Sequence, residues 1–431
     1  MKEREVTEYI ESISGRGIVP GLGSIRELCR RLDSPQKALK FVHVAGTNGK
    51  GSVSAYMAEA LKCGGYRVGR YISPVIFEYR ERIQVNGRYI TKEALGRLLE
   101  QVKQACDEMV SDGMPQPTAF EVETALGFLY FREKSCDIVI LEAGMGGLLD
   151  ATNVIDFSLL AVITSVSMDH MKFLGNTLEE IAAQKAGIIK AGCRVVSAGQ
   201  QPEAAGVIAE RAAALGCPLS VVENSRITSV KYGLEKQRFC YGGLSGLEIS
   251  LAGKYQIENA ALAVEALKAL GGQGFPLAEE KLRQGLKQTA WAGRFSIVGK
   301  KPYFIVDGAH NEDAAKRFAE SVEFYFTNKR IIYIMGVLKD KEYEKMIALT
   351  HGLADQIITV TPPDSQRALP AYELAKEVAK VHPNVTAVDS LEEAVEMGRL
   401  LAGKEDVIIA FGTLSFAGRM IKIAGGNREV I

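Results

Sequence analysis

The sequence predicts a two-domain α/β protein in which a larger parallel-sheet domain is followed by a smaller one. Short apolar runs alternate with amphipathic helical segments along the chain, a pattern typical of parallel sheets covered by helices. The length of 431 residues exceeds one ordinary hydrophobic core. A fresh series of strands and helices begins after the only tryptophan, at WAGRF (291–295). We therefore place the domains at residues 1–295 and 296–431.

The larger domain contains apolar runs that we interpret as buried strands of one parallel sheet. They are FVHVA (41–45), YRVGRYIS (66–73), CDIVILEAG (136–144), LLAVITSVS (159–167) and CRVVSAG (193–199). Amphipathic segments such as VSAYMAEALKCGG separate them and repeat apolar residues at helical spacing.

Two stretches interrupt this alternation. Asn86-Gly87 lies between alternating residues in RERIQVNGRYIT and predicts a β-hairpin. Residues 220–251 are rich in Val, Tyr and Gly and predict a small antiparallel insertion. Both would be additions to the parallel sheet.

The smaller domain repeats the strand–helix alternation. Helical stretches such as EDAAKRFAESVEFY and LPAYELAKEVAKV lie between its strand candidates. The candidates are YFIVDGAHN, RIIYIMGV, QIITVTPP, NVTAVD and DVIIAFGT. This pattern predicts a second α/β domain of ordinary size.

Composition excludes several classes of protein. The chain has 52 basic and 52 acidic side chains and no block of Lys and Arg, which argues against a nucleic-acid partner. The 7 cysteines are scattered and never form a C-x-x-C pair, so we expect reduced thiols rather than disulfides or a zinc site. No apolar window is long enough to span a membrane, and the first residues are charged. We expect a cytoplasmic protein, and the balanced charge favours a monomer.

The segment GTNGKGS (46–52) joins a predicted strand to a predicted helix. Glycines let backbone N–H groups approach phosphate oxygens, the helix N-terminus adds positive potential, and Lys50 can reach the outer phosphates. The match to the general P-loop pattern is incomplete, because Val44 stands where that pattern has glycine and Gly51 follows the lysine. The alternative is a tight turn selected only for packing.

Polar residues follow the neighbouring strands and suggest a metal site. Ser73, Glu142 and Asp169-His170 come at or after the ends of three predicted strands, where α/β proteins place their ligands. Glu142 is a natural Mg²⁺ ligand, while His170 is less so. Each also has an ordinary structural interpretation, with Glu142 as a paired buried acid, His170 as a loop histidine and Ser73 as a helix cap.

Lys185 lies on the apolar face of a predicted helix in NTLEEIAAQKAGIIKAG, two turns after Leu178. Asn176 is the expected N-cap of that helix. An inward lysine needs a partner or a modification, because an isolated buried charge is costly. The alternative is a surface lysine at the margin of the apolar face.

Together these residues resemble folylpolyglutamate synthase and the bifunctional dihydrofolate synthase, members of the ATP-dependent Mur ligase superfamily. The ordered motifs are GTNGKGS, ISP (72–74) with ERIQVNG, FEVETA, LEAGMGGLLDATN, TSVSMDH, QKAGI, WAGR and DGAHN. The resemblance implies a P-loop-type ATPase domain and a smaller Rossmann-like glutamate-ligase domain, with substrates between them. It also implies an acyl phosphate route that joins L-glutamate to a reduced folate or to dihydropteroate.

The resemblance further assigns roles to individual residues. ATP would be bound by Asn48, Gly49, Lys50, Gly51, Ser52, Asn259, Arg294, Asp307 and His310. Mg²⁺ would be held by Ser73, Glu142, His170 and a carbamylated Lys185, and the resemblance leaves open a monovalent cation. Lys50, Lys185, His170 and Glu142 would form the catalytic set, and Leu149, Asp150, Ala151 and Thr152 would meet the pterin substrate.

Two departures concern the pterin end. Leu148 stands where the family usually has arginine, and Val75 stands where histidine often follows SP. Three other functions stay open at this point: a cell-wall Mur-type amino acid ligase, a P-loop kinase or ATPase that forms no amide, and a non-catalytic nucleotide-binding module. The hairpin motif and LDATN favour the folate branch.

Overall fold

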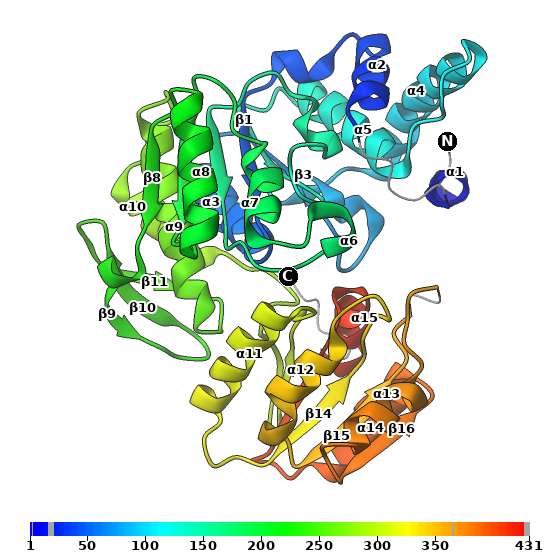
Figure 1. The fold of residues 1–431 in the computed structure, drawn as a ribbon, viewed down its shortest axis with the longest axis vertical. Helices are drawn as coiled ribbons and strands as arrows, with labels where there is room; N and C mark the ends of the chain where they lie inside the picture. Colours follow the sequence, from blue (N-terminus) through cyan, green and yellow to red (C-terminus); the bar gives the residue numbers. More distant parts are fainter. Residues whose placement is uncertain (2, 16–20, 364–365, 426–431) are drawn as a thin grey trace. The chain divides into compact units, whose positions relative to one another are not determined.

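The computed structural model describes residues 1, 3–15, 21–363 and 366–425 (Figure 1). They form two compact units. The N-terminal unit comprises Met1–Thr228, Tyr241–Leu247 and Asn259–Gln288. The C-terminal unit comprises Ser229–Cys240, Glu248–Glu258 and Thr289–Ile431. The predicted division into domains at residue 295 stays a prediction.

The N-terminal unit is built on a large sheet whose strand order is β4-β3-β2-β5-β1-β6-β7-β8. Its strands are β1 (Phe41–Ala45), β2 (Val68–Tyr71), β3 (Ile83–Val85), β4 (Arg88–Tyr89), β5 (Ile138–Glu142), β6 (Leu160–Ile163), β7 (Arg194–Ala198) and β8 (Leu219–Val222). From β2 to β8 in this order the pairs are parallel, and β3 and β4 are antiparallel additions. The strands of the parallel part are mainly apolar, with few polar interruptions such as His43 and Arg70, because helices cover both faces of the sheet.

The hairpin predicted at Asn86-Gly87 is present between β3 and β4. Both residues have positive φ, 50° and 77°, as a two-residue turn of type I′ requires. The pattern of alternating residues therefore identified this local structure correctly.

Helices cover the sheet on both faces. They are α1 (Glu3–Ser14), α2 (Gly23–Arg31), α3 (Lys50–Cys63), α4 (Lys92–Ser111), α5 (Ala119–Glu133), α6 (Met171–Leu174), α7 (Leu178–Ala186), α8 (Pro202–Ala214), α9 (Tyr255–Gly271) and α10 (Glu279–Gln288). Short 3₁₀ helices are η1 (Pro35–Ala38), η2 (Tyr79–Arg82), η3 (Ala151–Val154) and η4 (Asn224–Arg226). Helix α3 packs on β1, β2, β5 and α10, and α7 lies beside α8 (Figure 1).

The insertion forms a separate small sheet in the order β11-β10-β9. Its strands are β9 (Thr228–Lys231), β10 (Gln237–Tyr241) and β11 (Leu244–Ile249). Only Gly242 and Gly243, both with positive φ, connect β10 to β11, which makes that pair a hairpin. The predicted range of 220–251 began too early, because β8 pairs in parallel with β7 and belongs to the main sheet. It continues the strand–helix alternation after α8.

The C-terminal unit contains a second sheet in the order β12-β13-β17-β14-β15-β16. Its strands are β12 (Ser296–Lys300), β13 (Tyr303–Val306), β14 (Ile331–Met335), β15 (Gln356–Val360), β16 (Val385–Val388) and β17 (Val407–Phe411). The sheet is parallel except for the edge strand β12, which the sequence did not indicate. Its helices are α11 (Glu312–Tyr325), α12 (Tyr343–Thr350), η5 (His351–Leu353), α13 (Ala371–Ala379), α14 (Leu391–Leu401) and α15 (Leu414–Gly425).

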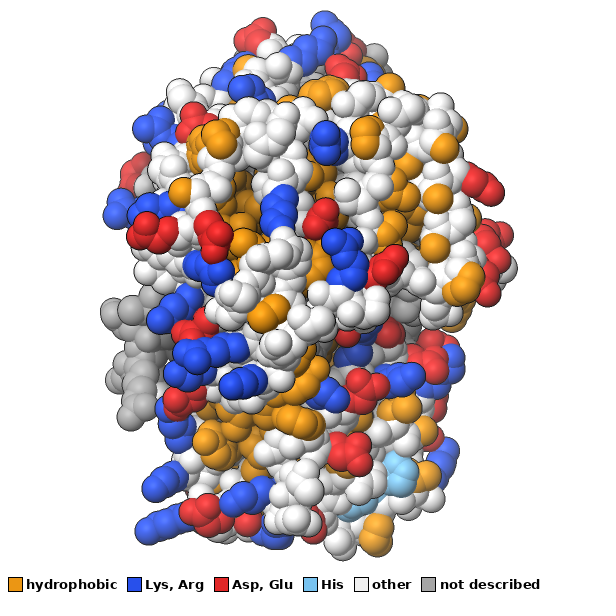
Figure 2. All heavy atoms as spheres, turned by 90° about the vertical axis from the view of Figure 1, so that its left-hand side faces the viewer, with side chains coloured by type: hydrophobic (Ala, Val, Ile, Leu, Met, Phe, Trp, Pro, Cys, Tyr) orange, Lys and Arg blue, Asp and Glu red, His pale blue; other side chains and the backbone are white. Residues whose placement is uncertain are grey.

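The predicted α/β class with a parallel sheet in each part is thus confirmed. Among the described residues, no helix combines the length and apolar character needed to cross a bilayer. The face drawn in Figure 2 carries basic and acidic side chains intermixed, in keeping with the equal numbers of each in the sequence.

Candidate active site

The glycine segment forms the turn between β1 and α3. Gly46 and Gly49 have φ values of 153° and 90°, which side-chain-bearing residues rarely adopt. Helix α3 begins at Lys50 and has no acidic residue in its first turn, so the helix itself places no carboxylate at the positive end of its dipole. The Lys50 ammonium bends back over the turn and donates to the carbonyls of Gly46 (3.0 Å) and Thr47 (3.2 Å). A cation and a helix N-terminus therefore point at the same turn, which suits a phosphate group.

The turn is held by the segment that follows β6. Thr47 N donates to Ser165 O at 2.7 Å, and Thr47 Oγ1 both donates to Ser167 O and accepts from Ser167 N, each at 3.0 Å. A Cβ on Gly46 would lie 1.8 Å from Thr164 Oγ1, so only glycine fits there. No pattern in the sequence predicts these hydrogen bonds, because Thr47 and its partners are far apart along the chain.

Asn259, from α9, also borders the turn. A Cβ placed on Gly49 would come within 2.6 Å of Asn259 Oδ1. The side chain predicted to contact the nucleotide thus lies directly beside the predicted phosphate loop.

The predicted metal ligands follow adjacent parallel strands. β2, β5, β1 and β6 are neighbours in that order, so Ser73, Glu142 and His170 follow or end strands at the same edge of the sheet as the glycine turn. Glu142 is buried and pairs in register with Val44. His170 is in the left-handed region, with φ 51° and ψ 36°, and its Nε2 lies 3.9 Å from Asp169 Oδ2.

A buried arginine that the sequence analysis did not select shares this region. Burial lowers the pKa of Arg70, on β2, to about 10, and the negative charge of Glu142 acts in the opposite direction. The arginine sits in the apolar strand VGRY, and this interruption was the available signal.

Lys185 is buried, with 3% of its surface exposed, so the alternative of a surface lysine is wrong. Burial and the nearby ammonium of Lys50 lower its pKa to about 7, while Asp169 and Asp150 act in the opposite direction. Lys185 therefore lies within electrostatic reach of Lys50, at the glycine turn. The N-cap of α7 is Thr177, which forms a capping box with Glu180, rather than the predicted Asn176. Thr177 fits because the reciprocal partner lies three residues later.

The predicted substrate segment packs against the end of α7. Leu148 N donates to Gln184 O at 2.7 Å, and a Cβ on Gly147 would lie 3.0 Å from Lys185 O. Asp150 and Thr152 are buried, whereas Leu148 and Leu149 are 40% and 45% exposed. The side chains available to a ligand in this segment are therefore two leucines.

The remaining predicted nucleotide contacts lie in the C-terminal unit. Asp307 is buried and accepts from Tyr255 Oη (2.9 Å), Phe295 N (2.7 Å) and Ala309 N (2.8 Å). Burial raises the pKa of Asp307, and the positive charge of Arg294 acts in the opposite direction. In this arrangement the carboxylate fixes the backbone beside Arg294.

Arg294 itself packs over a glycine. Its Nη1 donates to Gly293 O at 3.1 Å, and a Cβ on Gly308 would lie 2.5 Å from that nitrogen. His310 lies two residues after Gly308, and its Nδ1 is 2.8 Å from Gly308 O. Arg294 and His310 therefore both lie beside Gly308, in the C-terminal unit.

No group of three or more His, Cys, Asp or Glu side chains positioned to hold a metal occurs within residues 1, 3–15, 21–363 and 366–425. A Mg²⁺ site does not need such a group, because this ion usually takes one or two carboxylates and completes its shell with water and phosphate oxygens. Glu142, the hydroxyl of Ser73 and a nearby phosphate would fit that mode.

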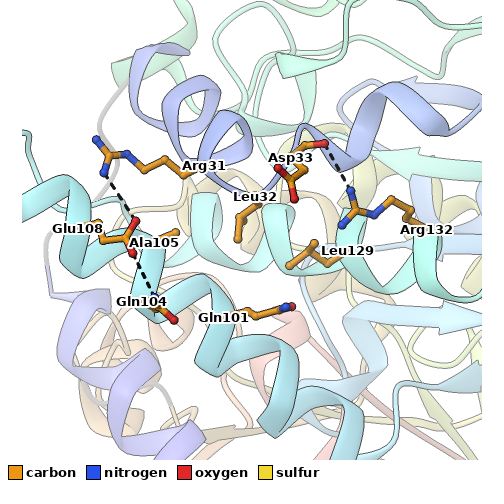
Figure 3. Close-up of a pocket in the computed structure, with 9 residues that line it drawn as sticks. All are labelled: Arg31, Leu32, Asp33, Gln101, Gln104, Ala105, Glu108, Leu129 and Arg132. Carbon is orange, nitrogen blue, oxygen red and sulfur yellow. Dashed lines mark hydrogen bonds and ion pairs between the residues drawn. The ribbon is translucent and has the colours of Figure 1, made fainter.

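Two surface hollows, one in each unit, add no reactive group. Figure 3 shows the one at α2, α4 and α5, where Arg132 Nη1 donates to Asp33 O at 3.4 Å. Its volume is about 180 Å³, and Arg31, which also lines it, donates through Nη2 to Asp112 Oδ2 at 2.5 Å. The other, of about 310 Å³, contains the ion pair of Arg317 with Glu258 at 2.7 Å. In both, arginines are paired with acidic or carbonyl neighbours.

Comparison with known proteins identifies the family of the chain. The Mur ligase middle domain family matches residues 44–267, and the family described as Mur ligase, glutamate ligase domain matches residues 293–414. The dihydrofolate synthase/folylpolyglutamate synthase of Bacillus subtilis is 37% identical over 412 residues, covering 93% of this chain and 94% of that protein. The chain belongs to the folylpolyglutamate synthase and dihydrofolate synthase family of Mur ligases.

Solved structures of this family agree over almost the whole chain. Mycobacterium tuberculosis folylpolyglutamate synthase, complexed with ADP and AMPPCP, has a TM-score of 0.90 and 27% identity, covering 99% of this chain and 100% of that one. Escherichia coli FolC in complex with DHPP and ADP has a TM-score of 0.87 and 28% identity, covering 98% and 97%. The resemblance in the motifs is confirmed, and the chain is an ATP-dependent ligase of this family.

Proposed function

We propose that the chain joins L-glutamate to the carboxylate of a pteroyl substrate, either a reduced folate or dihydropteroate. The observation that carries the proposal is the convergence of Lys50, buried Lys185 and Asp169 at the glycine turn, in a chain of this ligase family. Relatives are named for both activities. A cell-wall substrate, a kinase and a non-catalytic module are each less favoured.

The chemistry needs activation, because a carboxylate oxygen is a poor leaving group. A substrate carboxylate oxygen attacks the γ-phosphorus of ATP, the bond to ADP breaks, and an acyl phosphate forms. The amine of glutamate then attacks the carbonyl carbon, phosphate leaves, and the nitrogen gives up a proton. Catalysis of such a transfer depends mainly on positioning and charge neutralisation.

The phosphate groups would be bound by Asn48, Gly49, Lys50, Gly51 and Ser52. Backbone N–H groups at the start of α3 and the Lys50 ammonium provide positive potential where negative charge accumulates. Asn259 would add a contact beside Gly49. We assign further nucleotide contacts to Arg294, Asp307 and His310, with Asp307 acting mainly on the backbone next to Arg294.

Mg²⁺ would be held by Ser73, Glu142, His170 and carbamylated Lys185. When bound, it would neutralise charge on the phosphate oxygens. A pKa of about 7 leaves a large neutral fraction of the Lys185 amine, the form that adds carbon dioxide. The carbamate would place a negative charge near the ammonium of Lys50, where the unmodified side chain would place a second buried ammonium. The burial of Lys185 supports this role, because burying an unmodified ammonium is energetically costly.

The pteroyl substrate would lie on the segment Leu149, Asp150, Ala151 and Thr152. Leu148 replaces the usual arginine and offers an apolar surface, so this chain would contact the substrate there without a charge. We also propose that the enzyme acts as a monomer, which light scattering coupled to gel filtration would test.

The test is a coupled ADP assay that offers dihydropteroate and tetrahydrofolate separately, with and without glutamate. A ligase releases ADP only when both the pteroyl carboxylate and the amine are present, whereas an ATPase releases it without them. Lys50→Ala and Glu142→Ala should abolish release, and Lys62→Ala, which removes an exposed lysine from the same helix α3, should not. Wild-type turnover in Lys50→Ala, or ADP release independent of glutamate, would refute the proposal.

A further inference from the structure

A histidine interrupts the central strand of the N-terminal sheet. β1 reads FVHVA and is buried along its whole length, with His43 fully buried between Leu141 of β5 and Ala161 of β6. The interior of a parallel sheet is normally apolar, and burying an imidazole without a hydrogen bond is costly. His43 therefore needs a partner.

The partner is in the substrate segment. His43 Nε2 lies 2.9 Å from Thr152 Oγ1, a contact between residues 109 positions apart. The single hydroxyl proton of Thr152 is donated to Asp150 Oδ1 at 2.5 Å, so the contact is made by a proton on His43 Nε2. Within the described residues, His43 Nδ1 has no hydrogen-bond partner. All of the imidazole's hydrogen bonding is thus directed at Thr152.

Asp150 connects Thr152, the partner of His43, to the beginning of the same loop. Its Oδ1 also accepts from Thr152 N at 3.0 Å, and its Oδ2 accepts from Met145 N at 2.8 Å. The carboxylate therefore ties the two ends of the 145–152 loop together. Gly144 lies against it, because a Cβ there would be 3.2 Å from Asp150 Oδ2.

The glycine turn follows β1, the strand that contains His43. The turn starts directly after Ala45, three positions after His43 on the same rigid strand. One imidazole therefore joins the element that holds the phosphate loop to the loop that carries Leu149.

We propose that His43 is a positioning residue, which holds the 145–152 loop, and with it the pteroyl substrate, in a fixed place relative to the phosphate loop. Positioning matters for this reaction because two substrates must meet with their reacting atoms aligned. His43 acts through Thr152 and Asp150 and touches no substrate. The inference rests on the proposed function, since it takes the 145–152 loop as the pteroyl site.

Two substitutions at His43 separate the hydrogen bond from the bulk of the ring. The amide nitrogen of glutamine reaches the position of Nε2, whereas that of asparagine stops near the position of Nδ1. We expect His43→Asn to raise KM for the pteroyl substrate at least tenfold and to leave the Kd of ADP within twofold of wild type. His43→Gln should stay within threefold in both quantities.

Substitutions at Thr152 test the same link from its other end. Thr152→Val should reproduce the His43→Asn phenotype, because it removes the hydroxyl that His43 contacts. The double variant His43→Asn/Thr152→Val should be no more than twofold worse than the worse single variant, because both remove one connection. Thr350→Val, which removes an equally buried hydroxyl in the C-terminal unit, should change neither KM nor Kd.

Hydrogen exchange gives a readout that does not depend on turnover. Exchange of the Met145 and Thr152 amides should accelerate at least tenfold in His43→Asn and remain unchanged in His43→Gln, because both amides bond to Asp150. If wild type lacks glutamate-dependent ADP release but shows this exchange pattern, the proposed function fails and the link stands. The proposal is overturned if His43→Asn keeps wild-type KM and exchange, if glutamine does no better than asparagine, or if KM and the Kd of ADP change by the same factor.

Discussion

The burial of His43 predicts a specific dependence of stability on pH. In the folded protein, burial lowers the pKa of His43 to about 3, and the ammonium of Lys190 acts in the same direction. In the unfolded chain the imidazole has its ordinary pKa of about 6.5. Below that pH the unfolded state binds one more proton than the folded state, so stability falls as the pH is lowered and the loss is complete near the folded pKa.

The size of the effect follows from the two pKa values. At pH 7.5 both states are almost entirely neutral, and His43 makes almost no contribution to the pH dependence. At pH 5 the proton bound only by the unfolded state costs the folded protein about 2 kcal/mol. This is a sizeable fraction of the ordinary stability of a domain, about 5–15 kcal/mol.

The measurement compares wild type with His43→Gln, which keeps a donor toward Thr152 but cannot titrate. Urea unfolding followed by far-ultraviolet circular dichroism at pH 7.5 and 5.0 gives the free energy of unfolding of each protein. Every other titrating group is common to both, so the difference between the two pH responses isolates His43. Wild type should lose about 2 kcal/mol more than the variant. An equal loss in both proteins would show that the imidazole is not held neutral in a dry site.

Three further predictions concern the site. Gly49→Ala should weaken ADP binding at least tenfold by calorimetry, because a φ of 90° and the contact with Asn259 both exclude a side chain; unchanged affinity would contradict the geometry. Lys185→Ala should lose ADP release at least a hundredfold and partly regain it with added short carboxylates, while full activity without them would mean that the buried lysine is only structural. Tyr255→Phe should destabilise the C-terminal unit by about 1.5–3 kcal/mol, the usual value of a hydrogen bond to a charged group, measured by urea unfolding with the single tryptophan as probe. A loss below about 0.5 kcal/mol would mean that the bond to Asp307 is replaced by water.

The sequence by itself determined the local elements and the family. The alternation of apolar runs and helices identified the parallel strands, and Asn86-Gly87 identified a hairpin, because period and turn chemistry are local properties of the chain. The ordered motifs identified the ligase family, which the comparisons confirmed. The segment GTNGKGS indicated a turn between a strand and a helix, and it joins β1 to α3.

Only the tertiary structure decided which side chains meet. Thr47 and Ser167 are 120 positions apart, and His43 and Thr152 are 109 apart. These pairs exist because the strands lie in the order β2, β5, β1, β6, an order that no periodicity in the chain encodes. The same packing buried Lys185 where the charge of Lys50 lowers its pKa, whereas the helical pattern alone left this lysine either inside or at the margin. Spacing along the chain fixes which face of an element a residue occupies, while the neighbour it meets across that face depends on how the whole sheet is assembled.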